Sequence, residues 1–312
     1  MSSAHLFLGS EFAQRPPANA RFHVIPVPYE RTVSYGTGTA HGPAAILEAS
    51  DQLEVFDGIS SPGEEGIHTA PAVECTGGPA EVFPRITAAV EVAVHGGPQG
   101  RGIPVILGGE HSLTAPAVQG VLEALSEPIG VVQIDAHADL RDAYEGLPHS
   151  HASVARRLHQ DLGVPLVQIG VRALCPEEVL YRADVAARAA GDPSYPNIIA
   201  HDAATIVPSA LSEILLPDSF PRRVYITIDV DGLDPSVIPA TGTPVPGGLG
   251  WYQFLSILRS IADSREIVGY DVVELAPIAV QPGWNYAAAE VVHRTMGIIA
   301  RSSAFSRASP GN

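Results

Sequence analysis

Short apolar runs alternate with amphipathic segments along most of the chain, and this alternation predicts its secondary structure. The apolar runs are rich in β-branched residues, which is typical of buried strands. They occupy residues 22–28, 103–107, 129–135, 164–170, 197–200, 224–230 and 267–274. Helical periodicity appears between most of them, at residues 43–56, 82–94, 176–190, 251–262 and 287–300. Strands that alternate with helices predict an α/β fold with three layers, α/β/α, around a mostly parallel central sheet.

The chain contains no linker long enough to divide it, so residues 1–312 are expected to form a single domain. Residues 57–79 are rich in Gly, Pro and Glu and predict a surface loop. The two ends, about residues 1–20 and 302–312, are expected to be flexible tails.

The charged residues exclude several kinds of chemistry. Arginine and lysine together number 18 against 34 acidic residues, which gives a net charge of −16, and lysine is absent altogether. Without lysine there is no Schiff base, no pyridoxal-phosphate anchor and no phosphate-binding-loop lysine. The acidity disfavours nucleic acid and anionic membranes as partners and suits a small cationic or neutral substrate.

The cysteines and the apolar runs indicate in which cellular compartment the protein is expected. Cys75 and Cys175 form no C-x-x-C pattern, so free thiols in a reducing compartment are expected, with a single disulfide as the alternative. Residues 1–17 lack the basic start and apolar stretch of a signal peptide. No apolar run approaches the ~18 residues that a membrane helix needs. We therefore expect a cytoplasmic protein.

Carboxylates and imidazoles follow four of the predicted strands. Ligands gather at the carboxyl ends of parallel strands, so these residues are candidates for chemistry. Side chains two apart on an extended chain point to the same side, which would bring one set together after strand 129–135 and another after strand 224–230. The candidates are His111, Asp135, His137, Asp139, Asp229, Asp231 and Glu274.

Four carboxylates crowded into one crevice would repel one another, and divalent cations would relieve this repulsion. A single D-x-D is most often a turn or a solvated loop. The combination of several such groups, each at the end of an apolar strand and beside a Gly-Gly-x-His turn, favours a metal site. Oxygen-rich ligation with some imidazole suits Mn²⁺, and Zn²⁺, Ni²⁺, Co²⁺ and Fe²⁺ stay open on ligand type alone.

Several motifs, in order, make the chain resemble the ureohydrolases, the family of arginase, agmatinase, guanidinobutyrase and formiminoglutamase. They are DAHAD at 135–139, DVDGLDP at 229–235 and GTPVPGG at 242–248. The resemblance begins with PVPY at 26–29 and GPAAI at 42–46 and ends with VELAP at 273–277. It covers nearly the whole chain and implies the arginase-like fold, assembled into trimers or hexamers.

The resemblance also implies a binuclear manganese site. One ion would be held by His111, Asp135, Asp139 and Asp229, and the other by Asp135, His137, Asp229 and Asp231. Asp234 is expected to be a turn or supporting residue, since Asp-Pro often starts a turn. Glu110 departs from the pattern because most members carry Asp in this turn, but the charge is kept.

Catalytic roles follow from the same resemblance. Glu274 resembles the carboxylate that receives the guanidinium, with a buried salt bridge to an arginine as its structural alternative. Asp139 resembles the residue that hydrogen-bonds the attacking water and passes its proton on. His151 resembles the histidine that shuttles protons, and its Ser-His-Ala context favours it over His149.

The expected reaction is hydrolysis of a guanidino compound to urea and an amine. Residues 140–146 look like the agmatinase branch, so agmatine, giving putrescine, is the first candidate. Arg141 stands where arginases carry Asn; it would contact substrate, clamp the carboxylate of guanidinobutyrate, or pair with Asp142 or Glu145. Residues after Pro277 are unusual, so guanidinobutyrate, free guanidine and arginine stay open. An inactive family member acting as a binding or regulatory subunit is the alternative of another class, and the intact ligand set argues against it.

Overall fold

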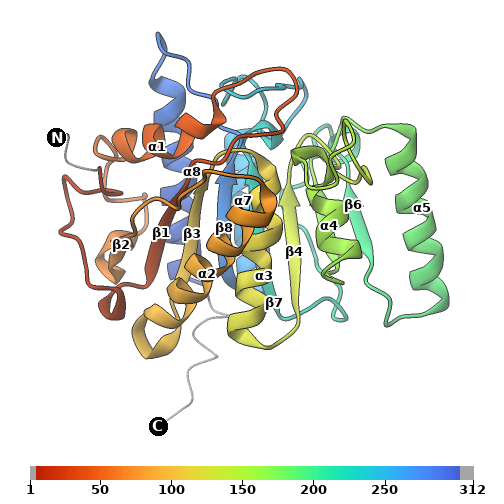
Figure 1. Ribbon diagram of the computed structural model, residues 1–312, viewed down its shortest axis with the longest axis horizontal. Helices are drawn as coiled ribbons and strands as arrows, with labels where there is room; N and C mark the ends of the chain where they lie inside the picture. The colour runs from red at the N-terminus through yellow and green to blue at the C-terminus, as the bar shows by residue number, and fades with distance from the viewer. Residues whose placement is uncertain (1–4, 303–312) are drawn as a thin grey trace.

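The central sheet of the computed structural model, which describes residues 5–302, has eight strands in the order β2-β1-β3-β8-β7-β4-β5-β6 (Figure 1). Every neighbouring pair of these strands is parallel. The strands are β1 (Phe22–Val27), β2 (Ile67–Thr69), β3 (Ile103–Gly108), β4 (Ile129–Ile134), β5 (Leu166–Ile169), β6 (Ile198–His201), β7 (Arg223–Asp229) and β8 (Glu266–Val273). The prediction of an α/β fold around a parallel sheet is confirmed.

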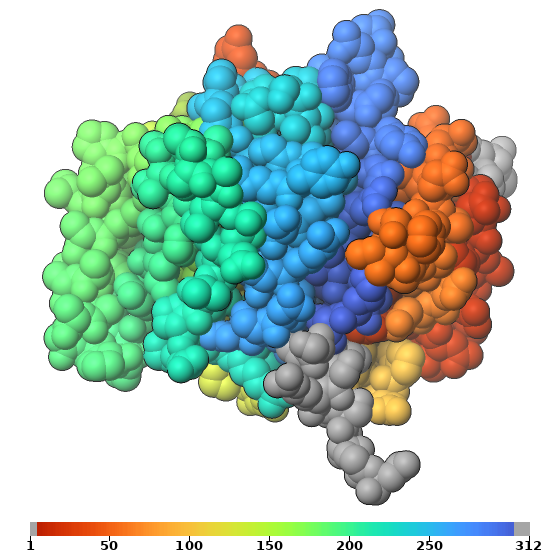
Figure 2. Space-filling model, turned by 180° about the vertical axis from the view of Figure 1, so that it is seen from behind, coloured from red at the N-terminus to blue at the C-terminus, as the bar shows by residue number. Residues whose placement is uncertain are grey.

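Helices cover both faces of this sheet. They are α1 (Gly42–Ser50), α2 (Pro79–Gly96), α3 (Thr114–Leu125), α4 (Val154–Gln160), α5 (Pro176–Gly191), α6 (Ala203–Ile206), α7 (Trp251–Ser264) and α8 (Gly283–Ala300). Residues of α2, α3 and α4 share one buried cluster with the sheet, and residues of α1, α7 and α8 share the other. Figure 2 shows this second face, with the blue segments that include α7 and α8 over its middle. No helix within residues 5–302 is both long and apolar enough to cross a membrane.

The structure differs from the prediction in its short and irregular elements. Strand β2 lies inside the predicted surface loop 57–79, and among the described strands its three residues pair only with β1. Helices α3 and α4 and the single turn of α6 were not predicted. Pro116 and Gly120 weaken the helical signal of α3, which is nevertheless buried against α2.

The predicted flexible N-terminal tail is packed over residues 5–20. Phe7 and Leu8 are buried in the same cluster as Ile46, and the backbone N–H of Leu8 donates to Ser50 Oγ at 2.9 Å. The burial of these two side chains, together with hydrogen bonds from Phe7 N–H to Thr69 and from Ser10 N–H to Asp51, attaches this segment to α1 and β2. Residues 1–4 and 303–312 of the two predicted tails lie outside the described part of the chain.

Candidate metal centre

The predicted site residues gather at the carboxyl ends of β3, β4, β7 and β8, around a cavity of about 200 Å³. Its walls include most of the predicted metal ligands and also residues of three loops. The lining that bears on the chemistry is His111, His137, Asp139, Arg141, Tyr144, His151, Asp229, Asp231 and Glu274. Asp135 is fully buried beside it.

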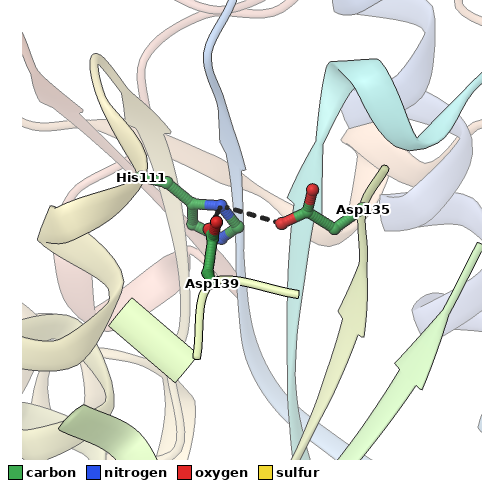
Figure 3. Close-up of side chains that lie close together, drawn as sticks. All are labelled: His111, Asp135 and Asp139. Atoms are coloured by element: carbon green, nitrogen blue, oxygen red, sulfur yellow. Dashed lines mark ion pairs between the residues drawn. The ribbon is translucent and has the colours of Figure 1, made fainter. Parts of the chain in front are cut away.

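His111 lies at the centre of the first half of the site. Its Nδ1 is 3.2 Å from Asp135 Oδ2, 3.2 Å from Asp139 Oδ2 and 3.4 Å from Asp229 Oδ2. Figure 3 shows the imidazole with the first two carboxylates turned toward it. Although these oxygens are near, Nδ1 makes no well-directed hydrogen bond to any residue in the range 5–302. A buried nitrogen lone pair among three carboxylates fits a metal cation, which would accept all of them as ligands.

His137 forms the second half. Its Nδ1 lies 3.0 Å from Asp231 Oδ2 and 3.7 Å from Asp135 Oδ1. The two halves therefore share Asp135, whose two oxygens face one imidazole each. The side chains could hold metal ions in two adjacent groups, one around His111 and one around His137.

The convergence of these side chains does not arise from an extended strand end. Strand β4 stops at Ile134, and Asp139 has a φ of 52°. Asp229 ends β7, but Asp231 lies in a 3-10 turn, and its backbone N–H donates to Asp229 Oδ1 at 2.8 Å. Glu274 also has a positive φ, of 65°. Such a backbone is strained for residues other than glycine, and this strain recurs at functional sites.

Burial and mutual repulsion make it unfavourable for all the carboxylates of the cluster to be charged at once. Burial, reinforced by Asp135, raises the pKa of Asp139 to about 7. Burial and Asp231 raise the pKa of Asp229 well above its usual value. Burial opposes a charge on His137, but its carboxylate partners outweigh burial and raise its pKa to about 12. In the absence of other cations the cluster holds protons, and divalent ions would take their place.

A row of buried polar side chains crosses the sheet beneath the site. Gln168, Gln133, Thr227 and Asp271 are register partners on β5, β4, β7 and β8. Gln133 Nε2 donates to Asp135 Oδ2 at 2.7 Å, and Gln168 Nε2 donates to Gln133 Oε1 at 2.6 Å. On the other side of the row, Thr227 Oγ1 lies 2.8 Å from His111 Nε2. The row thus orients two of the candidate metal ligands, Asp135 and His111, through hydrogen-bond contacts.

Arg172 also supports the site, and no motif in the sequence marks this residue. Its guanidinium donates to the carbonyl oxygens of Gly170 at 3.1 Å, Asp231 at 2.6 Å and Val245 at 2.6 Å. It therefore ties the turn that carries Asp231 to the loop around Val245. Asp234, as expected, is a turn residue: its carboxylate accepts the backbone N–H groups of residues 236, 247 and 248.

Glu274 is 8% exposed and lines the cavity. Its Oε1 accepts the backbone N–H of His111 at 2.7 Å, and within residues 5–302 its carboxylate forms no ion pair with an arginine. Burial raises its pKa to about 8, although the bond from His111 acts in the opposite direction. A carboxylate buried at this cost is available to pair with a cationic group in the cavity.

The two candidate histidines, His149 and His151, lie in different surroundings. His151 lines the cavity, and burial lowers its pKa. His149 instead packs edge-on against Phe83, with ring centroids 5.7 Å apart. The cavity therefore favours His151.

Arg141 lines the cavity and lies over the ring of Tyr144, 5.2 Å from its centroid. The predicted alternative for Arg141, a structural ion pair with Asp142 or Glu145, is not observed. Asp142 pairs with Arg157 at 2.9 Å instead. Arg141 is therefore placed to contact a ligand.

A parallel α/β sheet that carries these imidazoles and carboxylates at its carboxyl edge defines, together with the order of the sequence motifs, an enzyme of the ureohydrolase class. The sequence profile of the Arginase family matches residues 20–297. The chain belongs to the Arginase family.

Relatives of known name match almost the whole chain. The N(1)-aminopropylagmatine ureohydrolase of Synechocystis sp. is 38% identical over 295 residues, which cover 93% of this chain and 92% of the relative. The agmatinase of Pyrococcus horikoshii is 32% identical over 286 residues, covering 91% and 93%. The crystal structure of agmatine ureohydrolase of Thermoplasma volcanium matches with a TM-score of 0.72 and 26% identity, covering 97% of this chain and 99% of that one.

Proposed function

We propose that the protein hydrolyses the guanidino group of agmatine, giving urea and putrescine. One observation carries this proposal: the cluster of imidazoles and carboxylates that could hold metal ions lines the same small cavity as the buried carboxylate of Glu274. A guanidinium binds a carboxylate through paired N–H donors, so Glu274 would hold the substrate carbon beside the cluster. Relatives named agmatinase support the same reaction.

Two divalent ions would occupy the cluster, and Mn²⁺ is the ion we propose. The donor set is mostly carboxylate oxygen with two imidazoles, which suits Mn²⁺; Ni²⁺ or another divalent ion is the alternative. We assign one ion to His111, Asp135, Asp139 and Asp229, and the other to Asp135, His137, Asp229 and Asp231. When bound, such ions lower the pKa of water and so supply a nucleophile at neutral pH.

The remaining steps belong to side chains of the chain itself. Glu274 orients the guanidinium. Asp139 accepts a hydrogen bond from the attacking water and passes its proton on. His151, at the cavity wall, delivers a proton to the leaving amine, which cannot depart as an anion.

A longer substrate, N(1)-aminopropylagmatine, is the second candidate. Tyr35 lines the cavity and is 87% exposed, so the cavity opens to solvent there. An amine tail longer than that of agmatine would extend through this opening without displacing the buried guanidinium. The relative from Synechocystis sp. supports this candidate. Arg141 would contact the far end of the substrate, and it would favour a carboxylate there, as in guanidinobutyrate.

We further propose a homo-oligomer, a trimer or hexamer, that acts in the cytoplasm in polyamine metabolism. The oligomeric state rests on the resemblance to the ureohydrolases. Cys75 and Cys175 are free, which is compatible with a reducing compartment.

The test is urea release by the purified protein, loaded with Mn²⁺ or with Ni²⁺. The substrates are agmatine, N(1)-aminopropylagmatine, guanidinobutyrate, arginine and guanidine. The highest kcat/KM on agmatine supports the first candidate, and the highest on N(1)-aminopropylagmatine supports the second. No urea from any of them, with metal bound, would contradict the proposed function and favour a binding or regulatory role. Asp229→Ala should lose metal and activity together; retention of both would refute the ligand assignment.

A further inference from the structure

The hydroxyl of Thr32 joins three groups beside the cavity. Thr32 Oγ1 lies 3.2 Å from His151 Nδ1 and 2.9 Å from Glu110 Oε1. It also accepts the backbone N–H of His151 at 3.0 Å. A single hydroxyl therefore lies between a carboxylate and the ring of the histidine.

Glu110 decides where the hydroxyl hydrogen points. This carboxylate is fully buried, and its Oε2 accepts the backbone N–H groups of Arg31 and Thr32, while its Oε1 accepts the hydroxyl of Ser112. A carboxylate surrounded by donors only accepts hydrogen bonds. The contact between Thr32 Oγ1 and Glu110 Oε1 therefore requires that Thr32 donates its hydrogen to Glu110.

The position of the hydrogen on the His151 ring then follows, because the Thr32 hydroxyl can donate only one hydrogen bond. With its own hydrogen directed at Glu110, Thr32 Oγ1 has only acceptor positions left, and the backbone N–H of His151 takes one. The contact with His151 Nδ1 is a hydrogen bond only if Nδ1 carries the hydrogen. We propose that Glu110 and Thr32 are positioning residues that hold His151 as its Nδ1–H tautomer and leave Nε2 as the proton-accepting atom.

The proposal also gives a reason for the glutamate at position 110. The side chain of aspartate is shorter by one carbon–carbon bond, about 1.5 Å. From the same backbone position an aspartate would fall short of the N–H groups of residues 31 and 32. The longer side chain of Glu110 ties residues 31 and 32 to the turn that carries His111. The inference rests on the proposed function only for the role of Nε2 in proton transfer.

Glu110→Gln is the sharpest perturbation because it keeps the shape of the side chain. The two backbone N–H groups at Oε2 cannot reorient, so the amide oxygen must face them. The amide NH₂ must then face Thr32 and donate to its hydroxyl oxygen. Both acceptor positions of Thr32 are filled, and its hydrogen must turn to His151 Nδ1. The variant should therefore invert the tautomer of His151.

The tautomer is measured by NMR of the full-length protein labelled with ¹⁵N-histidine, both metal-free and saturated with diamagnetic Zn²⁺. His151→Gln assigns the signal by its loss. We expect the Nδ1–H form in the wild type, the Nε2–H form in Glu110→Gln and a mixture in Thr32→Val. Thr32→Ser, which keeps the hydroxyl, and Glu30→Gln, whose residue holds the same loop through the N–H groups of residues 38 and 40, should keep the wild-type form. An Nε2–H wild type, or one tautomer in all variants, would overturn the proposal.

Kinetics give the second measurement. Because general acid–base catalysis contributes about 10²–10⁴-fold, we expect kcat of Thr32→Val to fall at least tenfold, with KM changed less than about threefold. Thr32→Ser should stay within about threefold of the wild-type kcat. Equal loss in Val and Ser, or an effect on KM alone, would indicate a merely structural role. If the wild type releases no urea, the proposed function fails, while the NMR result still decides the tautomer.

Discussion

Replacing Thr227 by valine tests whether a hydrogen bond from the sheet keeps the Nδ1 lone pair of His111 available to a metal ion. Thr227 Oγ1 donates to Asp271 Oδ1 at 2.6 Å, and Asp271 also accepts the hydroxyls of Tyr225 and Thr114 at 2.9 Å each. Since Thr227 has used its hydrogen, its 2.8 Å contact with His111 Nε2 makes it the acceptor of an Nε2–H. The Nδ1 lone pair is then free to face the three carboxylates.

Valine keeps the shape of threonine but leaves the Nε2–H without an acceptor in a fully buried place. A buried donor without a partner costs about 1–3 kcal/mol. The ring escapes this cost by moving its hydrogen to Nδ1, where it competes with the metal. Loss of such a supporting bond typically lowers metal affinity about 10–100-fold. This range corresponds to about 1.4–2.8 kcal/mol, in agreement with the cost of the buried donor.

The assay is competition for Mn²⁺ between the protein and a chelating dye, at pH 7.5, with Thr227→Ser as the matched control. The serine variant keeps the hydroxyl and should bind within about threefold of the wild type, a difference smaller than one ordinary hydrogen bond. Circular dichroism should show that both variants are folded. A valine variant that binds Mn²⁺ as tightly as the wild type would refute the reasoning.

Three further predictions concern residues around the site. Arg172→Met should lower both the melting temperature and the Mn²⁺ affinity, because the turn of Asp231 loses its hydrogen bonds to Arg172 and thus its connection to Val245. Each lost charge-assisted hydrogen bond is worth about 1.5–3 kcal/mol. Thermal unfolding with and without metal checks this prediction. Glu274→Gln should retain metal, measured by elemental analysis, but lose most of its turnover, since the neutral amide cannot pair with a guanidinium; unchanged turnover would remove Glu274 from substrate binding. Hydrogen bonds from Ser236 and from the N–H groups of residues 247 and 248 lower the pKa of Asp234 to about 2. The stabilisation is therefore complete above the usual value of 3.8 and fades as the pH falls toward 2, so the difference in unfolding free energy between wild type and Asp234→Asn should be larger at pH 6 than at pH 2.5.

The long elements could be predicted from the sequence because their signal is local. Apolar runs between helical segments gave seven strands of the sheet to within a few residues. The edge strand β2 has only three residues, and its pairing with β1 is decided by contacts distant in sequence. The N-terminal segment was missed for a similar reason: Phe7 and Leu8 are two apolar residues without periodicity, and contacts with α1 and β2, distant in sequence, make them part of a core.

The sequence predicts which candidate ligands come together, but not the geometry in which they do so. Motif order and residue type select the carboxylates and imidazoles, whereas the positive φ values of Asp139 and Glu274 are imposed by the fold. One available signal was overlooked. Gln133 precedes Asp135 by two residues and Thr227 precedes Asp229 by two, so each lies on the same side of its strand as the ligand that follows. A polar residue in a strand buried on both faces needs a partner, and here the partners include the candidate metal ligands Asp135 and His111.

The two threonines link buried acids to the histidine rings of this site. Asp271 fixes the hydrogen of Thr227, and Glu110 fixes that of Thr32. In our proposal each threonine selects a different tautomer: Nε2–H in His111 and Nδ1–H in His151. His111 would thereby present its Nδ1 lone pair to the carboxylates, and His151 would keep Nε2 for protons. A threonine and a buried acid, brought together from distant parts of the chain, would thus give two chemically identical rings different roles.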